Sequence, residues 1–157
     1  MSRLSGSTGE SGQPPYRTIA RRFAWFPIVV FIMHVAAAHV FDLYRRWPPV
    51  DIPLHLIGGF AIAFFCSGAI GVLHRCELIT VWNRLVQLLL AFALVGMAAV
   101  FWEFAEWAAD HTIGTRCQID LDDTMLDMFC GVFGGSMFIL LSILWGSVKE
   151  SANTEKV

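Results

Sequence analysis

Four apolar stretches, each about 20 residues long, constrain the fold of this chain more than any other feature of its sequence. They cover residues 23–41, 53–73, 85–107 and 124–145. As a helix rising 1.5 Å per residue, each can cross a hydrocarbon core of about 30 Å. Only 15% of the residues are charged, against about 25% in soluble domains. The sequence therefore predicts an all-α membrane protein, a bundle of four transmembrane helices in one domain over residues 21–147.

The two ends of the chain differ in composition from these stretches. Residues 1–20 are rich in Ser, Gly and Pro without an apolar period, which predicts a disordered cytoplasmic N-terminal tail. Residues 148–157 predict a similar C-terminal tail. Arg21 and Arg22 precede the first stretch as in a signal peptide, but the apolar run continues to Phe41, which favours an uncleaved helix.

The distribution of Lys and Arg predicts the orientation of the bundle. With four spans, both termini and the loop 74–84 share one side of the membrane. Eight of the 11 basic residues fall on that side: Arg3, Arg17, Arg21, Arg22, Arg75, Arg84, Lys149 and Lys156. Because cytoplasmic loops carry the excess of Lys and Arg, we expect a multi-pass protein of the inner (cytoplasmic) membrane with both termini in the cytoplasm.

Most of the acids fall at the opposite, outer end of the predicted helices. Nine of the 13 lie there: Asp42, Asp51, Glu103, Glu106, Asp110, Asp120, Asp122, Asp123 and Asp127. The first and third helices end on that side, and the second and fourth begin there. The alternation predicts that acids far apart in the sequence converge in one leaflet.

Three of these acids close the third apolar stretch. Glu103, Glu106 and Asp110 share one helical face. They lie near a helix C-terminus, where the dipole is negative and favours cations. Ionised carboxylates in hydrocarbon are costly unless they are paired. This face therefore needs a cationic partner.

The second apolar stretch begins with Asp51 and His55 at i and i+4, and Gly59 continues their face. An acid before a proline-initiated helix is typical of a cap, which is the favoured interpretation of Asp51. His55 lies one turn inside the membrane, next to two glycines that let another helix approach. It is predicted to be a ligand or a proton carrier.

The fourth stretch repeats the spacing with Asp123 and Asp127, followed by Gly131 and Gly134 near the same face. Gly131-xxx-Gly135 is also typical of close helix packing, so the acids are predicted to point into the bundle. Asp127 lies too deep for a cap and is predicted to be a site residue, whereas Asp122 is interpreted as the N-cap.

The remaining histidines and cysteines give weaker signals. His39 is a further candidate ligand, and His34 is interpreted as hydrogen-bonded to a neighbouring helix. The four cysteines show no CxxC spacing and are interpreted as small apolar residues: Cys66, Cys76, Cys117 and Cys130.

Three motifs together resemble the YjdF-like family of small membrane proteins. They are His55-Leu56-Ile57-Gly58-Gly59-Phe60, Trp102-Glu103-x-x-Glu106-Trp107, and Asp123-Thr124-x-x-Asp127 followed by Gly131 and Gly134. More distantly they resemble the VanZ-like family, in which an Asp-x-x-x-His helix and a late Asp-rich, Gly-rich helix recur. The resemblance covers about residues 51–135 and departs at Met125, where YjdF-like proteins tend to have glutamine. VanZ-like proteins are associated with glycopeptide-antibiotic resistance. The resemblance implies a fold and a site, but no reaction.

The leading hypothesis is a divalent-metal site in the outer leaflet that acts on a phosphate-bearing lipid or a lipid-linked envelope substrate. The expected metal ligands are Glu103, Asp110, Asp123 and Asp127, and the expected catalytic residues are His55 and Glu106. Carboxylates suit Mg²⁺, Mn²⁺ or Ca²⁺, and one histidine also allows Zn²⁺ or Fe²⁺.

Two alternatives belong to other classes. One is an ion- or proton-coupled transport element. The other is a non-catalytic structural or interaction subunit whose acids pair with Arg45, Arg46 and Arg116, although three arginines cannot neutralise nine acids. The expected partners are membrane lipids, and a net charge of −2 argues against nucleic acid. The sequence leaves the substrate and the oligomeric state open.

Overall fold

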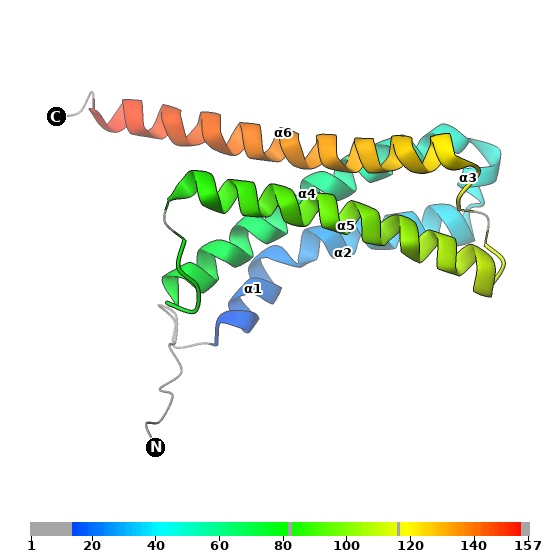
Figure 1. Ribbon diagram of the computed structural model, residues 1–157, viewed down its shortest axis with the longest axis horizontal. Coiled ribbons are helices and arrows are strands. Elements are labelled where there is room, and N and C mark those ends of the chain that lie inside the picture. The colour runs from blue at the N-terminus through cyan, green and yellow to red at the C-terminus, as the bar shows by residue number, and fades with distance from the viewer. Residues whose placement is uncertain (1–13, 82, 116, 155–157) are drawn as a thin grey trace, which may run out of the picture.

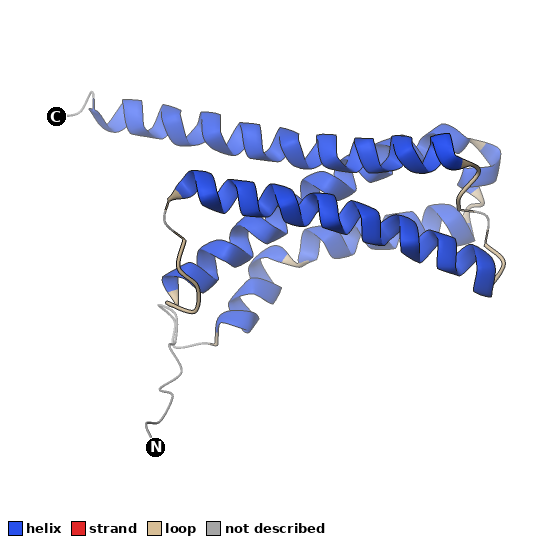
Figure 2. Cartoon of the chain, in the orientation of Figure 1, coloured by secondary structure: helices blue, strands red, loops and turns tan. Residues whose placement is uncertain are grey.

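The computed structural model describes residues 14–81, 83–115 and 117–154, with side chains for all of these except 39, 48 and 147–154. Its helices are joined by short loops (Figures 1 and 2). In chain order they are α1 Pro15–Phe23, α2 Trp25–Val35, the π-helical turn η1 Ala36–Val40, α3 Leu43–Arg46, the 3-10 turn η2 Pro48–Val50, α4 Asp51–Arg75, α5 Arg84–Thr112 and α6 Leu121–Thr154. No strand occurs in these described ranges, which confirms the all-α prediction.

Three helices are long and apolar enough to cross a membrane among the residues described: α4, α5 and residues 121–146 of α6. The first predicted span is broken, because α1 and the helix that follows it meet at an angle of 50°. Pro27 explains the break, since it has no N–H to donate to the carbonyl of Phe23 four residues earlier. The described part of the chain therefore has three candidate spans, or four if the bent pair crosses as one.

The predicted tails are shorter than expected. Helix α1 already begins at Pro15, so residues 15–20 are helical and not disordered, while residues 1–13 lie outside the described part. Helix α6 continues to Thr154, so the predicted C-terminal tail is helical over residues 148–154. Apolar composition ends near Trp145, but the backbone hydrogen bonds of a helix continue past the end of its apolar face.

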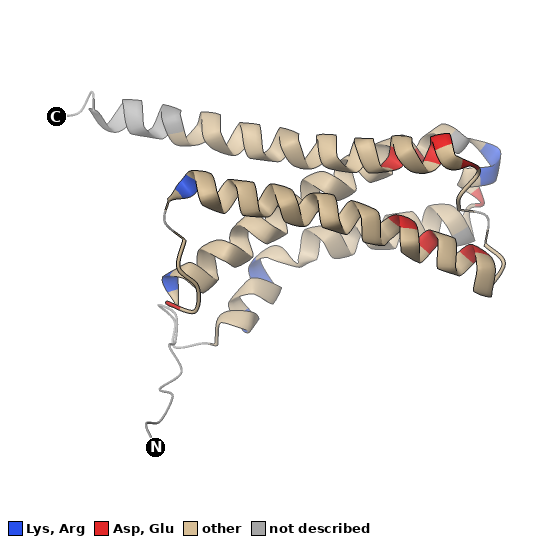
Figure 3. Ribbon diagram, in the orientation of Figure 1, with Lys and Arg blue, Asp and Glu red and all other residues tan. Residues whose placement is uncertain are grey.

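The start of α1 and the end of α6 lie at the same end of the bundle (Figure 1). The acids of α5 and α6 gather at the opposite end (Figure 3). This arrangement agrees with the predicted convergence of the acids. The cytoplasmic location of the termini stays a prediction.

Small side chains fill the interior. Ala61, Ala63 and Ala91 are completely buried, and Val95 is nearly so. Large apolar side chains instead cover the outer surface, as at Phe129. Without a hydrophobic force between helices in lipid, close backbone packing holds such a bundle together.

The closest approach joins α4 to α6. A Cβ added at Gly59 would overlap the carbonyl oxygen of Gly131, and one added at Gly134 would overlap the carbonyl oxygen of Leu56. His55 lies one turn before Gly59, and Asp127 lies one turn before Gly131. The backbone contact therefore brings these two side chains side by side.

Candidate metal centre

Five ionisable side chains from α4, α5 and α6 meet inside the acidic end of the bundle. Less than one-tenth of each is exposed: Asp51, His55, Glu103, Glu106 and Asp127. The sequence placed all five at the outer ends of the predicted helices. Because burying a charged group in an apolar bundle is costly unless it is paired, the hydrogen bonds and charges around each of these side chains need to be accounted for.

Asp51 is the first residue of α4, but its expected role as a cap is wrong. Val50 occupies the N-cap position, and no side chain caps this helix. Asp51 Oδ1 instead lies 3.2 Å from His55 Nε2, one turn further along. Neither atom has a hydrogen-bond partner, because the pair is misaligned for one. The carboxylate faces the cluster and not the helix end.

Each glutamate of α5 has one engaged and one unpartnered oxygen. Glu103 Oε2 accepts from Gln118 Nε2 at 3.1 Å, and Glu106 Oε1 accepts from Trp102 Nε1 at 3.0 Å. Glu103 Oε1 and Glu106 Oε2 have no hydrogen-bond partner. Glu103 Oε1 lies 3.9 Å from His55 Nδ1.

His55 stands between two sets of donors. Ligand atoms of Asp51, His55 and Asp127 lie within 4.8 Å of one another, and so do those of His55, Glu103 and Glu106. Because Nε2 faces Asp51 and Nδ1 faces Glu103, the two ring nitrogens serve different sets. Asp127 is 2% exposed. Either set can hold a divalent cation.

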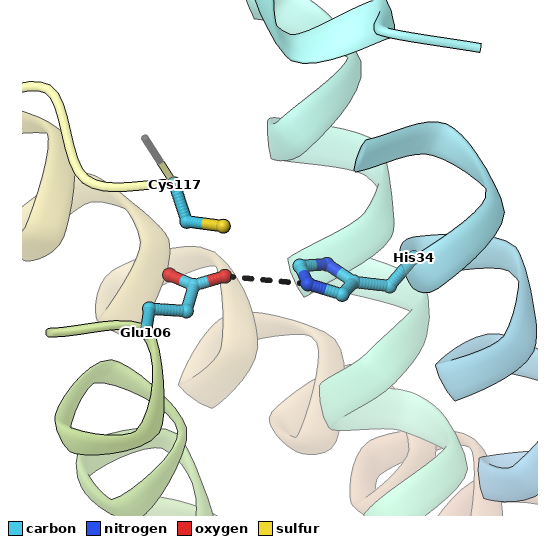
Figure 4. A group of neighbouring side chains, drawn as sticks. All are labelled: His34, Glu106 and Cys117. Atoms are coloured by element: carbon cyan, nitrogen blue, oxygen red, sulfur yellow. Dashed lines mark ion pairs between the residues drawn. The ribbon is translucent and has the colours of Figure 1, made fainter. Parts of the chain in front are cut away.

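A third set joins His34 of α2 to Glu106 and Cys117 (Figure 4). His34 Nε2 lies 3.6 Å from Glu106 Oε1, and His34 Nδ1 is 2.6 Å from the Tyr44 hydroxyl. The hydrogen bond between His34 and Tyr44 agrees with the hydrogen-bonding role expected for His34. Burial, and after it the Asp51 charge and hydrogen bond, raise the pKa of Tyr44.

Cys117 is buried in the loop between α5 and α6. Burial, followed by the charge of Glu106, raises the pKa of its thiol to about 11. The sequence interpretation of Cys117 as a small apolar residue missed its place beside Glu106. No spacing along the chain signals that contact, which depends on the path of the loop.

Asp110 and Asp123 hold this loop instead of joining the buried cluster. The Asp110 carboxylate accepts from the Thr115 hydroxyl and from the backbone N–H groups of Cys117 and Gln118. Asp123 Oδ2 accepts from the N–H of residue 119. Within the described ranges neither joins a set of three candidate ligands, so the geometry favours Asp51 in their place.

The cap of α6 also differs from the expectation. Asp120 Oδ1 accepts from the N–H of Asp123, and Asp122 is exposed. The helix begins at Leu121, earlier than the apolar pattern indicates, so Asp120 takes the cap position that was assigned to Asp122.

Histidines supply the ion pairs that the described residues form at this site. Arg45 and Arg46 are exposed and form none there, and Arg116 lies outside the described residues. The side chain of His39 is likewise not among those that the structure describes. Arginine pairing, the basis of the structural-subunit alternative, therefore has no support from Arg45 or Arg46.

An apolar cavity of about 120 Å³ adjoins the cluster on the side of the bundle centre. Side chains of α2, α4 and α5 line it, with both histidines among them: Val30, Phe31, His34, His55, Ala99 and Trp102. The cavity brings a hydrocarbon-like space next to the polar site.

No curated protein and no solved structure matches the chain. The model of one family, described as a predicted membrane protein family (DUF2238), matches residues 17–147. The YjdF-like family is known by this designation, so that resemblance is confirmed, whereas nothing supports the VanZ-like one. The chain belongs to the DUF2238 family of membrane proteins.

Proposed function

We propose that the chain binds one divalent cation at Asp51, His55 and Asp127 and acts with it on a phosphate-bearing lipid or a lipid-linked envelope substrate. One observation carries the proposal. Buried ligand atoms face one another without hydrogen-bond partners on Asp51, His55 and Glu103. Such atoms lose the free energy of hydration unless a cation replaces it.

The distances suit a cation. Two ligands about 2.0–2.1 Å from one ion lie about 3–3.5 Å apart. Asp51 Oδ1 and His55 Nε2 are 3.2 Å apart, and Asp127 completes the set within 4.8 Å. Two carboxylates and one imidazole suit Mn²⁺ and Mg²⁺ and also allow Zn²⁺.

Glu103 faces the ring nitrogen of His55 that is turned away from the ion. Its Oε1 has no hydrogen-bond partner and lies 3.9 Å from His55 Nδ1, so it is placed to orient the imidazole while Nε2 binds the ion. Gln118 holds its other oxygen, which fixes the orientation of the carboxylate. A divalent cation supplies the rest of the chemistry, since it polarises a phosphoryl oxygen and acidifies bound water.

The neighbouring cavity supports a lipid as the substrate. Its walls are largely apolar, and His34 and His55 are among the residues that line it. Part of a hydrocarbon chain fits this space while a phosphate group meets the ligands of the ion.

Manganese binding tests the metal site. The full-length protein, purified in detergent and stripped with chelator, is titrated with Mn²⁺ and followed by electron paramagnetic resonance. We expect one bound ion in the wild type, loss of that ion in Asp127→Asn, and retention in Asp122→Asn, whose side chain is exposed. A wild type without bound Mn²⁺, or two variants that bind equally, contradicts the proposal.

Release of phosphate from phosphatidic acid in mixed micelles tests the reaction. We expect release to need Mn²⁺ and to be lost in Asp127→Asn. A protein that binds Mn²⁺ but releases no phosphate contradicts the assigned reaction. A protein that instead conducts ions in liposomes in a pH-dependent way favours the transport alternative.

A further inference from the structure

We propose that His34, Glu106 and Cys117 form a second metal site, which binds a thiophilic divalent cation of the Zn²⁺ type. Their ligand atoms lie within 4.8 Å of one another. They come from three segments, α2, α5 and the loop after α5. Figure 4 shows the Cys117 sulfur pointing toward the space between the imidazole and the carboxylate.

Glu106 gives a second, independent indication of a ligand. Its residue is 4% exposed, and its Oε2 has no hydrogen-bond partner. The other oxygen accepts from Trp102 and faces His34 at 3.6 Å. A carboxylate fixed by an indole N–H, with one buried oxygen unused, is oriented for a cation.

Tyr44 orients the imidazole for metal binding. Its hydroxyl lies 2.6 Å from His34 Nδ1. The hydroxyl oxygen can accept the Nδ1–H of His34, which selects the tautomer with a deprotonated Nε2. The lone pair of Nε2 is then directed at Glu106. Metal-binding histidines are typically held by an oxygen acceptor on the other nitrogen in this way.

The ligand types select the cation. Thiolate, imidazole and carboxylate together suit Zn²⁺, while Mg²⁺ and Ca²⁺ prefer oxygen ligands. Binding displaces the thiol proton to solvent, because the thiolate is the ligand. Three protein ligands leave a fourth position open, as in catalytic zinc sites.

This second site does not need the first to be occupied. Asp51, His55 and Asp127 contribute none of its ligands. The two sites also differ in the ion that they favour, since only the second contains sulfur. If one of the two proposed sites binds no metal, the other can therefore still be tested.

Co²⁺, a spectroscopic substitute for Zn²⁺, tests the second site in the full-length protein. We expect a sulfur-to-cobalt charge-transfer band that is lost in Cys117→Ser. The band should persist in Cys66→Ser, a free cysteine of α4 outside the three ligand sets, and in Asp127→Asn, which disrupts only the first site. A wild type without the band, or a band that survives Cys117→Ser, overturns the proposal. Loss of the band in Asp127→Asn overturns it too, because the sulfur-bound ion then depends on a residue outside the three ligands.

X-ray absorption of the zinc-loaded wild type keeps the test independent of any variant that fails to fold. We expect a zinc–sulfur distance of about 2.3 Å. A shell made only of nitrogen and oxygen overturns the second site. Mn²⁺ prefers oxygen ligands to thiolates, so Mn²⁺ binding tests the first site separately.

Discussion

His55 Nε2 lies 3.2 Å from Asp51 Oδ1 on the same face of α4, yet neither atom has a hydrogen-bond partner. A helix-capping acid would turn toward backbone N–H groups. A carboxylate that faces a histidine without a hydrogen bond is compatible with the proposed role of both as ligands of one ion. This relationship argues against a helix cap and supports the proposed metal site.

Asp51→Asn should therefore weaken Mn²⁺ binding at least tenfold, which corresponds to about 1.4 kcal/mol. The metal-free variant should unfold at the same temperature as the wild type or a higher one, because a buried charge is removed. Calorimetric titration and thermal unfolding in detergent measure the two effects. Asp122→Asn is the control, and equal Mn²⁺ affinities in the two variants contradict the assignment.

Glu103→Gln should reduce activity more than stability. Glutamine keeps an oxygen for the amide of Gln118, which now bonds Glu103 Oε2, and it removes a buried charge. We expect an unchanged or higher melting temperature and about 10–100-fold slower phosphate release, as for loss of a carboxylate that orients a metal-binding histidine. A destabilisation of roughly 3–5 kcal/mol would instead indicate a structural ion pair with His55.

Gly59→Ala and Gly134→Ala should each destabilise the bundle by about 1–3 kcal/mol or more, because the added methyl group overlaps a backbone carbonyl of the other helix. Gly96→Ala is the control, since a Cβ there meets no atom within 4 Å. It should be neutral or stabilise by up to about 1 kcal/mol. Thermal unfolding in detergent compares the three. Equal melting temperatures would contradict the close contact of α4 with α6.

Much of this fold could be predicted from length and polarity alone. Apolar stretches of membrane-spanning length specify helices, and alternating directions of successive spans bring their acidic ends together. Glycine spacing after His55 and Asp127 indicated which faces meet. The first span was predicted as continuous because its composition is uniformly apolar, although Pro27 breaks the hydrogen-bond pattern of the helix.

The loop between α5 and α6 could not be predicted in the same way. Its path depends on Asp110, which accepts hydrogen bonds from residues five to eight positions later. Helical periodicity places Asp110 on the same face as Glu103 and Glu106, and it says nothing about contacts with a following loop. Asp110 was therefore predicted to be a metal ligand. Cys117 was assigned no ligand role for the same reason. Asp51 precedes a proline at the start of a helix, which is the sequence context of a helix cap. The same context is compatible with a buried ligand, so the sequence could not separate the two roles.

Both termini should lie in the cytoplasm. Eight of the 11 basic residues fall on their side of the predicted bundle, and basic loops stay inside. Green fluorescent protein fused after Val157 should fluoresce, and alkaline phosphatase fused there should be inactive. An active phosphatase fusion would reverse the orientation and move the site to the inner leaflet.

Asp110→Ala should loosen the loop while leaving the first metal site intact. The change removes an acceptor shared by Thr115, Cys117 and Gln118, which should lower stability by about 1.5–3 kcal/mol, as for hydrogen bonds to a charged group. Mn²⁺ affinity should change less than tenfold, whereas the cobalt–sulfur band should weaken because Cys117 loses its fixed backbone.

Asp120→Ala is the matched control for Asp110→Ala. It removes the cap of α6, where Asp120 Oδ1 accepts from the N–H of Asp123, and should cost about 1 kcal/mol. It has no contact that positions Cys117, so the cobalt–sulfur band should persist. If Asp110→Ala abolishes Mn²⁺ binding and Asp120→Ala does not, Asp110 is a metal ligand after all, as its place on the acidic face of the third apolar stretch first indicated.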